Sequence, residues 1–325
     1  MNTTNDRVEL SIIVPVFNTG SYLKRCLTSI ENQTFKNYEL ICVDDCSDDT
    51  NTKKVLGEKR ACKYKIITLD QHIGAASARN IGMSAASGYY IMFLDSDDFF
   101  EETMLEKMFN QIKNENSDIC VCGHLRINMT GNLEKKRLGY LGNETYIKSI
   151  EALGEDAFVR FSLNPWSYMI KRNVLIQNNI EFQTIHLNND VYFVLAVLMY
   201  ALGISICPEY LVSHTIGRGN QVTANYDLWT VFGVFTYTIF KEDINIDTKL
   251  YTKIMYLWLR SIPGGIRRCQ DDYMRKQVYT CLSYMAMKEW KYLGFIDKDI
   301  NGILNNLLTN QDDFEWIYNT CKFNE

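Results

Sequence analysis

The sequence predicts an α/β protein with an open, mostly parallel sheet between two layers of helices. Three observations predict this class. Strand-like and helix-like segments alternate strictly over the first hundred residues, the strand-like segments are apolar along their whole length, and two of them end in aspartates. Strict alternation is typical of a parallel sheet with helical crossovers, and continuous apolar strands are typical of a sheet that is covered on both faces.

The elements of this first part follow in order. Strands are expected over 9–17, 38–45, 64–70 and 89–95, and helical patterns over 20–33, 50–60 and 74–87. The first helical pattern has one apolar stripe, which consists of Leu23, Cys26, Leu27 and Ile30. Ser47 or Asp48 is expected to cap the second helix. The third helix is rich in small residues, so it could lie close against the sheet.

The remaining elements are less regular. An amphipathic helix is expected over 101–116, a strand over 118–128, and a loop or hairpin over 129–145. The uncharged run 191–207 approaches the length of a membrane span, but it is short for one and Gly203 interrupts it. We interpret it as a buried helix followed by a strand.

Composition excludes several classes of protein. The chain has 325 residues, a formal charge of −5 and scattered Lys and Arg residues, so no nucleic-acid partner is expected. Ten cysteines without a C-x-x-C pair indicate buried thiols rather than a disulfide scaffold, a zinc site or redox chemistry. The first residues lack the pattern of a signal peptide. A cytoplasmic location is therefore expected.

Acidic residues follow two of the predicted strands. Asp44 and Asp45 end the second strand, and the fourth leads into Asp95, Asp97 and Asp98. Open α/β sheets bind ligands beyond the carboxyl ends of their strands, so these carboxylates are expected to face a ligand. Neither a G-x-G-x-x-G motif nor a P-loop is present to hold phosphate. The sequence therefore predicts a site for Mg²⁺ or Mn²⁺ that bridges phosphate oxygens.

Helix capping is the alternative explanation for the second acidic group. Negative charge is favourable at a helix N-terminus, but a single acid is enough for a cap. We assign that role to Asp98, or to Glu101 and Glu102. Asp95 and Asp97 are then available for a metal ion, or for a metal ion and a ribose.

The order and spacing of motifs over residues 10–100 resemble those of the family 2 glycosyltransferases of the GT-A fold. The resemblance rests on the first strand with Pro15, the "QTF" after the first helix, the strand that ends in Asp44-Asp45, the A-R-N-x-G element at 78–82 and the D-x-D at 95–97. It implies a GT-A type open, mostly parallel sheet flanked by helices. From Tyr226 onward the composition shifts to an aromatic-rich helical pattern, which predicts a separate helical C-terminal region. The expected division is 1–102 for donor binding, 103–225 for acceptor binding in the same domain, and 226–325 for the helical region.

The resemblance also implies roles for donor-binding residues. Asp45 matches the acid that accepts a hydrogen bond from uracil N3–H, which a carboxylate suits because it only accepts. Phe17 lies where an aromatic ring stacks on the base, although ordinary core packing is an equal alternative. Asp95 matches the acid near the ribose and Asp97 the acid that binds the metal. Arg79 could reach the diphosphate, or pair with one of these acids, which we favour. The remaining members of this set are Pro15 and Ser96.

The catalytic base is expected in a second, more variable region. In "LNNDVYFVLAV", Asp190 is the best match for the carboxylate that takes the acceptor hydroxyl's proton. Asn189 departs from the family, which commonly has an acid there, so burial alone would have to raise the pKa of Asp190. A helix N-cap role for Asp190 is the alternative, and His186 is the second candidate for the base.

A later loop, "SHTIGRGNQVTAN", resembles in position the flexible loop that closes over the diphosphate. His214 or Arg218 would touch phosphate there, although a Gly-rich turn can also serve connectivity alone. Trp166 could stack on an acceptor sugar, but core packing is the favoured use.

The function implied is an inverting, metal-dependent glycosyltransferase. It would move a sugar from a UDP-sugar to a hydroxyl of a glycan or lipid-linked glycan, as in polysaccharide biosynthesis. A catalytically silent module for binding or assembly is the alternative, whereas a nucleotidylyltransferase would need a Gly-rich phosphate loop that is absent. The C-terminal helices could form a homodimer or contact the inner face of a membrane.

Overall fold

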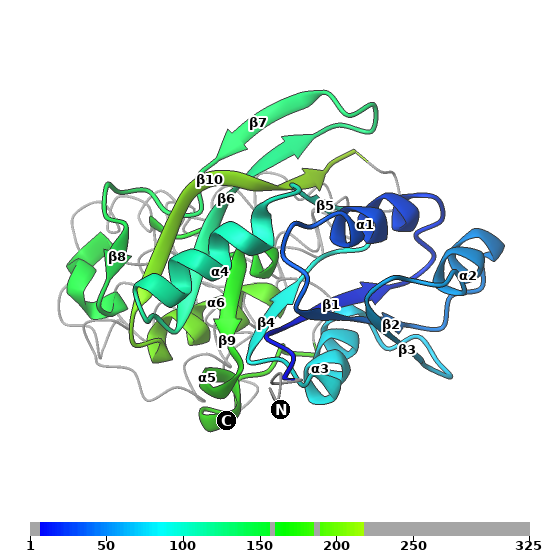
Figure 1. Ribbon diagram of the computed structural model, residues 1–325, viewed down its shortest axis with the longest axis horizontal. Coiled ribbons are helices and arrows are strands. Elements are labelled where there is room, and N and C mark those ends of the chain that lie inside the picture. The colour runs from blue at the N-terminus through cyan, green and yellow to red at the C-terminus, as the bar shows by residue number, and fades with distance from the viewer. Residues whose placement is uncertain (1–6, 157–159, 185–188, 218–325) are drawn as a thin grey trace, which may run out of the picture. The chain divides into compact units, whose positions relative to one another are not determined.

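The computed structural model describes residues 7–156, 160–184 and 189–217. The chain divides into two units, Met1–Gln221 and Val222–Glu325, and the described residues belong to the first. In this unit, helices lie on both faces of one large sheet (Figure 1). The predicted α/β class with a mostly parallel sheet is thereby confirmed. The predicted C-terminal helical region lies outside the described residues, and the division into donor and acceptor halves stays a prediction.

The first four strands form the parallel part of the sheet. They are β1 (Leu10–Val16), β2 (Tyr38–Asp44), β3 (Lys63–Thr68) and β4 (Tyr90–Phe93). Their order is β3-β2-β1-β4, with β1 paired to β2 on one side and to β4 on the other. The carboxyl ends of these strands therefore meet at one edge, called the carboxyl edge below. The strand order reverses between β1 and β4, and such a reversal is where open α/β sheets form their ligand crevice.

Helices cover both faces of this part of the sheet. They are α1 (Tyr22–Glu31), α2 (Thr50–Leu56), α3 (Ala75–Ala85) and α4 (Met104–Asn114). All four residues of the stripe predicted for α1 are buried. They share one core cluster with alternate residues of β1 and β2 and with buried residues of α2 and α4. The other face of β1 and β2 contacts α3.

The close approach of α3 depends on a glycine. A Cβ on Gly82 would lie 2.4 Å from Cγ2 of Ile13 and 3.4 Å from Cγ2 of Val43. A side chain fits in that space only if Ile13 or the strand that carries it moves, because real Cβ contacts are longer. The expectation that a helix of small residues packs close against the sheet is confirmed.

The rest of the described unit extends the sheet beyond β4. Its elements are β5 (Phe99–Phe100), β6 (Ile119–Ile127), β7 (Leu133–Arg137), β8 (Tyr146–Ile147), two 3₁₀ helices (Ile150–Asp156 and Pro165–Ser167), β9 (Tyr168–Lys171), α5 (Arg172–Gln177), α6 (Asn189–Tyr200) and β10 (Ile204–Thr215). Because β9 is antiparallel to both β4 and β6, β6 runs in the direction of β4, and β10 is parallel to β6. The end of β10 therefore also lies at the carboxyl edge.

Two further predictions are confirmed here. The segment after β6 forms a hairpin with β7, which is antiparallel to it (Figure 1). The apolar run 191–207 divides between α6 and β10, and Gly203 lies between them with φ +95°, a conformation that favours glycine. Among the described residues, no helix has both the length and the apolar character needed to cross a membrane.

Two cap predictions are wrong. The side chain that caps α2 is Asp49, which accepts a hydrogen bond from the backbone N–H of Thr52, whereas Ser47 and Asp48 precede the cap. The helix α4 begins only at Met104, and its N-cap residue, Thr103, makes no side-chain cap bond. Asp98, Glu101 and Glu102 therefore do not cap it. Asp98 is instead bound to the end of β10, as described below.

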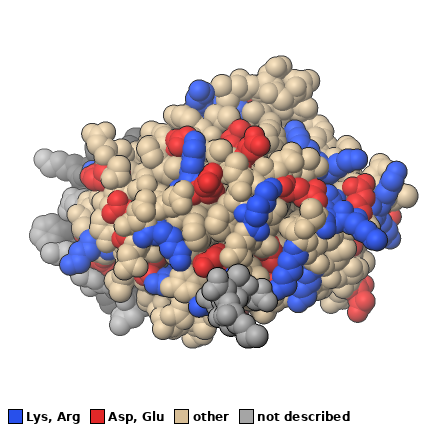
Figure 2. Space-filling view, in the orientation of Figure 1, with Lys and Arg blue, Asp and Glu red and all other residues tan. Residues whose placement is uncertain are grey.

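The surface charges are mixed. On the face shown in Figure 2, Lys and Arg side chains are interspersed with Asp and Glu side chains and separated by uncharged surface. The predicted burial of the strand cysteines is confirmed, since Cys42, Cys120 and Cys122 are fully buried and free.

Candidate active site at the carboxyl edge of the sheet

The loops that follow β1 and β2 are held together by a few polar side chains. Asn18, with φ 45°, accepts hydrogen bonds from the backbone N–H groups of Asp48 and Asp49 at 2.9 and 3.2 Å. Its own N–H donates to Oγ of Ser47 at 3.0 Å. Asparagine tolerates this left-handed conformation better than most residues. Phe17, just before it, is 40% exposed, so the core-packing alternative for Phe17 is wrong.

Asp45 follows β2, and its buried carboxylate has a partner on each of its two oxygens. Oδ1 accepts the backbone N–H of Ile73 at 2.7 Å, and Oδ2 accepts that of Gly74 at 2.8 Å. Nδ1 of His72 lies 2.8 Å from Oδ2, and the His72 ring stacks on Phe17 with centroids 3.8 Å apart. The two residues predicted to recognise the base are thus brought together. His72, which links them, was not predicted.

Arg79 connects the D-x-D to the start of α6. One terminal nitrogen forms an ion pair with Oδ1 of Asp95, and the other donates to Oδ1 of Asn189 at 3.1 Å. The guanidinium also lies over the ring of Phe182, 5.2 Å from its centroid. This geometry agrees with the favoured interpretation of Arg79 as a residue that holds one of the acids.

Asp190 lies in the first turn of α6, next to this network. The helix begins at Asn189, so Asp190 is not its N-cap and that alternative is wrong. Burial raises the pKa of Asp190, and the charge of Asp95 adds to this, whereas the positive charge of Arg79 opposes it. The direction is the one expected for a carboxylate that must accept a proton, and burial is its largest cause.

The D-x-D loop is tied to both neighbouring strands. Oγ of Ser96 lies 2.6 Å from Oγ1 of Thr19, which joins the loops after β4 and β1 across the reversal of strand order. The main-chain oxygen of Asp97 accepts hydrogen bonds at 2.8 Å from both Arg25 and the Thr215 hydroxyl. Pro15, the last residue predicted for this region, is buried within β1.

Asp98, which is fully buried, pairs with the partly exposed His214 between the D-x-D loop and the end of β10. Nδ1 of His214 lies 3.0 Å from Oδ2 of Asp98, whose Oδ1 accepts the backbone N–H of Thr215 at 2.8 Å. Burial raises the pKa of Asp98 to about 7, although His214 opposes this, and Asp98 in turn raises the pKa of His214. Trp166 is buried and stacks on His214. Core packing of Trp166 is confirmed.

Several predicted roles are not decided by this geometry. The phosphate contact of His214 stays a prediction, with Nδ1 already engaged by Asp98. Arg218 and His186 lie outside the described residues. Arg25 and His72 were missed because an exposed-looking basic residue on a helix and a lone histidine in a loop carry no distinctive sequence signal.

The acids fit a hard divalent cation in type. Asp95 and Asp97 are half-buried and offer oxygen atoms, which Mg²⁺ and Mn²⁺ prefer. Within the described part of the chain, no three His, Cys, Asp or Glu side chains converge into a metal cage. A cation there would therefore depend on oxygens from a bound phosphate, which is the usual situation for Mg²⁺ at a nucleotide.

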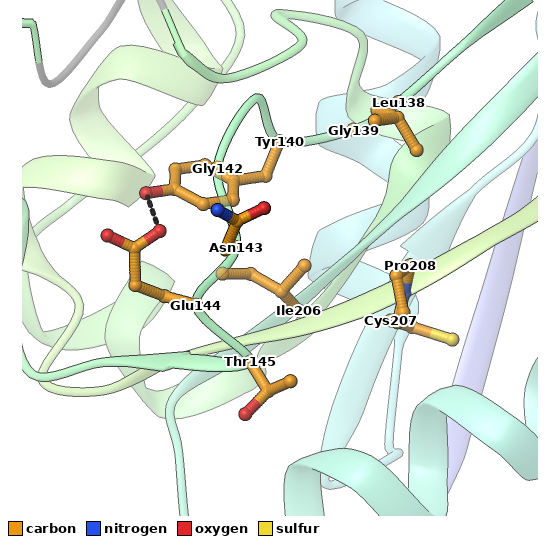
Figure 3. A pocket seen from close by; sticks show the side chains of 10 residues that line it. All are labelled: Leu138, Gly139, Tyr140, Gly142, Asn143, Glu144, Thr145, Ile206, Cys207 and Pro208. Atoms are coloured by element: carbon orange, nitrogen blue, oxygen red, sulfur yellow. Dashed lines mark hydrogen bonds between the residues drawn. The ribbon is translucent and has the colours of Figure 1, made fainter.

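The pocket in Figure 3 lies away from these residues. Its volume is about 230 Å³, and it is lined by residues 138–140 and 142–145 and by residues 206–208 of β10. The hydroxyl of Tyr140 donates to Glu144 at its rim, at 2.9 Å. None of the predicted site residues lines it, so the candidate site is defined by its side chains and not by this pocket.

Comparison with known proteins identifies the family. The family model described as Glycosyl transferase family 2 matches residues 11–187, which is more than half of the chain. The chain belongs to glycosyl transferase family 2. The matched region of this family 2 protein contains every predicted donor-site residue from Pro15 to Asp97 and ends just before Asp190.

Two curated relatives are similar to this family 2 protein over about two thirds of its length. A cholesterol galactosyltransferase of Borreliella burgdorferi is 30% identical over 66% of this chain and 62% of its own. The poly(ribitol-phosphate) beta-N-acetylglucosaminyltransferase TarP of Staphylococcus aureus is 30% identical over 67% of this chain and 66% of its own. The chain thus spans slightly less than two thirds of both relatives.

A solved structure shares the GT-A fold. TarS residues 1–349 of S. aureus, in complex with UDP-GlcNAc, matches with a TM-score of 0.74 and 17% identity, over 98% of this chain and 92% of that one. At this identity the likeness establishes the fold, and it confirms the GT-A type predicted from the sequence.

Proposed function

We propose that this protein is an inverting glycosyltransferase that moves a sugar from a UDP-sugar to a hydroxyl group of a glycan or lipid-linked glycan. One observation carries the proposal. The carboxyl edge of the sheet assembles an aromatic ring and a buried carboxylate suited to a base, two acids suited to a ribose and diphosphate, and a further carboxylate of raised pKa. These are Phe17, Asp45, Asp95, Asp97 and Asp190.

On the donor side, the residues bind and orient the nucleotide. Asp45 accepts the N3–H of uracil, which distinguishes uracil from cytosine because the N3 of cytosine is an acceptor. Asp95, held by Arg79, faces the ribose, and Asp97 lies beside the diphosphate. Asp97 and Asp95 would hold Mg²⁺ or Mn²⁺, which supplies positive charge to the departing diphosphate. The UDP-GlcNAc and UDP complexes of TarS support a uridine nucleotide by analogy of fold.

On the acceptor side, Asp190 takes the proton of the attacking hydroxyl. A base in this role works best when its pKa lies closer to the working pH than that of an exposed aspartate, and burial of Asp190 acts in that direction. Because Asn189 is neutral, it does not add to the negative charge around Arg79, which pairs with Asp95 and lowers the pKa of Asp190. Inversion at the anomeric carbon follows from direct displacement by the activated hydroxyl.

The names of the relatives indicate the class of acceptor. The relatives are named for transfer to cholesterol and to poly(ribitol-phosphate), so a hydroxyl of a lipid or polymer is a consistent acceptor. We retain peripheral contact with the inner face of a membrane, and a homodimer through the C-terminal region, as parts of the proposal.

Binding and turnover of the Asp97→Ala and Asp190→Asn variants test the function. UDP binding with Mn²⁺ should be lost in Asp97→Ala and kept in Asp190→Asn, and hydrolysis of the UDP-sugar should be lost in both. Asp48→Ala, which removes an exposed carboxylate from the neighbouring loop, is the matched control and should change neither. The donor is first found by thermal shift with a set of nucleotide sugars, because a bound ligand stabilises the folded state.

The opposite results are equally informative. Stabilisation by non-uridine nucleotides alone would show that Asp45 does not read uracil. A folded protein that binds UDP but hydrolyses no donor, with and without an acceptor, would favour the silent binding module.

A further inference from the structure

The ring of His72 makes the contacts that a nucleotide base would make. It stacks on Phe17 with centroids 3.8 Å apart and planes at 21°. Its Nδ1 lies 2.8 Å from Oδ2 of Asp45, the carboxylate oxygen directed toward the ring. A flat ring on an aromatic face with one nitrogen at a buried carboxylate is the arrangement proposed above for uracil.

Asp45 has little remaining capacity for a further donor on this side. A carboxylate offers about four acceptor positions, two on each oxygen. The backbone N–H of Ile73 takes one on Oδ1 and the N–H of Gly74 takes one on Oδ2, and Nδ1 of His72 lies in contact with Oδ2 at 2.8 Å. A base that stacks on the same face of Phe17 and donates to Oδ2 would have to replace the imidazole, because two rings cannot occupy the same space.

The side chain of His72 can leave without disturbing the loop. The loop's main chain is held by the hydrogen bonds of Ile73 and Gly74 to Asp45, which do not involve the His72 side chain. Gly74 then adopts φ +88°, and α3 begins at Ala75. The His72 side chain is 51% exposed, so a change of rotamer moves it into solvent.

We propose that His72 fills the base subsite of the free protein and must swing away before the uracil of the donor binds, so that it sets the affinity for UDP. This inference rests on the proposed function. It predicts that the imidazole competes with the nucleotide, and that removal of the side chain strengthens UDP binding.

Calorimetric titration with UDP and Mn²⁺ tests the proposal. His72→Ala should bind UDP about three- to tenfold more tightly than the unsubstituted protein, because an aromatic pair and a partly exposed contact with Asp45 no longer have to be broken. His72→Phe should show no such gain, because its ring still covers Phe17. Gln71→Ala, at the exposed neighbouring position, is the control and should leave the affinity unchanged.

A second measurement follows the ring itself. The chain has four histidines, so the imidazole resonances are few, and the His72→Ala variant identifies that of His72. Added UDP should move this resonance toward the position of a solvated imidazole.

The outcomes separate the two proposals. If UDP binds the unsubstituted protein and His72→Ala binds it equally or more weakly, then His72 supports the base or is irrelevant to it, and this inference is overturned while the proposed function stands. Equal gains in His72→Ala and His72→Phe would also overturn it, because they would show a general loosening of the loop. If neither the protein nor His72→Ala binds UDP, the proposed function fails and this inference fails with it.

Discussion

Replacing Arg79 with methionine should shift the pH dependence of the reaction. Arg79 is buried, contacts Asp95 and Asn189, and its positive charge is the largest influence that lowers the pKa of Asp190. Without the guanidinium, only the backbone hydrogen bonds at Asp190 and Val191 still oppose burial and the charge of Asp95, so the pKa of Asp190 rises further. The base works as the carboxylate, and activity is lost as the pH falls through its pKa. The acidic limb of the profile should therefore move to higher pH.

The magnitude follows from the surroundings of the residue. An arginine near a carboxylate lowers its pKa by about one to three units, and the limb should move by about one unit because Arg79 is shared with Asp95. Stability should also fall. Breaking a buried ion pair costs about 3–5 kcal/mol and an exposed one at most about 1 kcal/mol. With side chains 8% and 31% exposed, the pair of Arg79 and Asp95 lies between these limits, at about 2 kcal/mol.

The assay is the pH profile of kcat/KM for UDP-sugar hydrolysis, which reports the pKa of the free enzyme. Arg60→Met is the matched control. Arg60 is also buried, with 4% of its side chain exposed, and pairs with Glu31 at 2.8 Å away from the site. Both variants should lose similar stability in urea unfolding, but only Arg79→Met should shift the limb. A shift in both variants, or in neither, would refute the electrostatic reasoning.

Two further predictions concern stability. Gly88→Ala should lower the free energy of unfolding in urea by more than about 3 kcal/mol, because its Cβ would lie 2.5 Å from the backbone N of Ser11. Gly57→Ala, whose Cβ meets nothing closer than 3.5 Å, is the control and should be neutral or gain up to about 1 kcal/mol. Equal losses in the two variants would contradict this prediction. In metal-free buffer the melting temperature should fall as the pH rises from about 4, the pKa of an unfolded aspartate, through about 7, the raised pKa of Asp98, because stability present at low pH is lost as the folded carboxyl releases its proton. The raised pKa of His214 acts in the same direction. Asp98→Asn should remove most of this fall, and an unchanged slope in that variant would count against the pair.

The local patterns in the sequence were sufficient for most of the first hundred residues. The stripe on α1, the small-residue face of α3 and the apolar strands each follow from the period at which side chains repeat along one segment. The division of 191–207 at Gly203 was predictable for the same reason. The short strand β9, by contrast, was not predicted, because it exists only through antiparallel pairing with β4 and β6.

At the candidate site, too, patterns within one segment predicted the position of residues but not their partners. Parallel strands with acidic ends were enough to predict that Asp45, Asp95 and Asp97 share one edge of the sheet, since the carboxyl ends of such strands always do. The partners of those acids were not predictable. Arg79 meets Asn189 across 110 positions, and Asp98 meets His214 across 116.

The sequence by itself determined the fold class, the family resemblance and the placing of the acids, because these depend on periodicity and on short motifs within one segment. Only the tertiary structure decided that Asp98 is bound by His214 instead of capping α4, that Arg79 spans Asp95 and Asn189, and that His72 covers Phe17. A side chain's partner is chosen by which distant segments the sheet brings within hydrogen-bond distance. No pattern along a single segment contains that information.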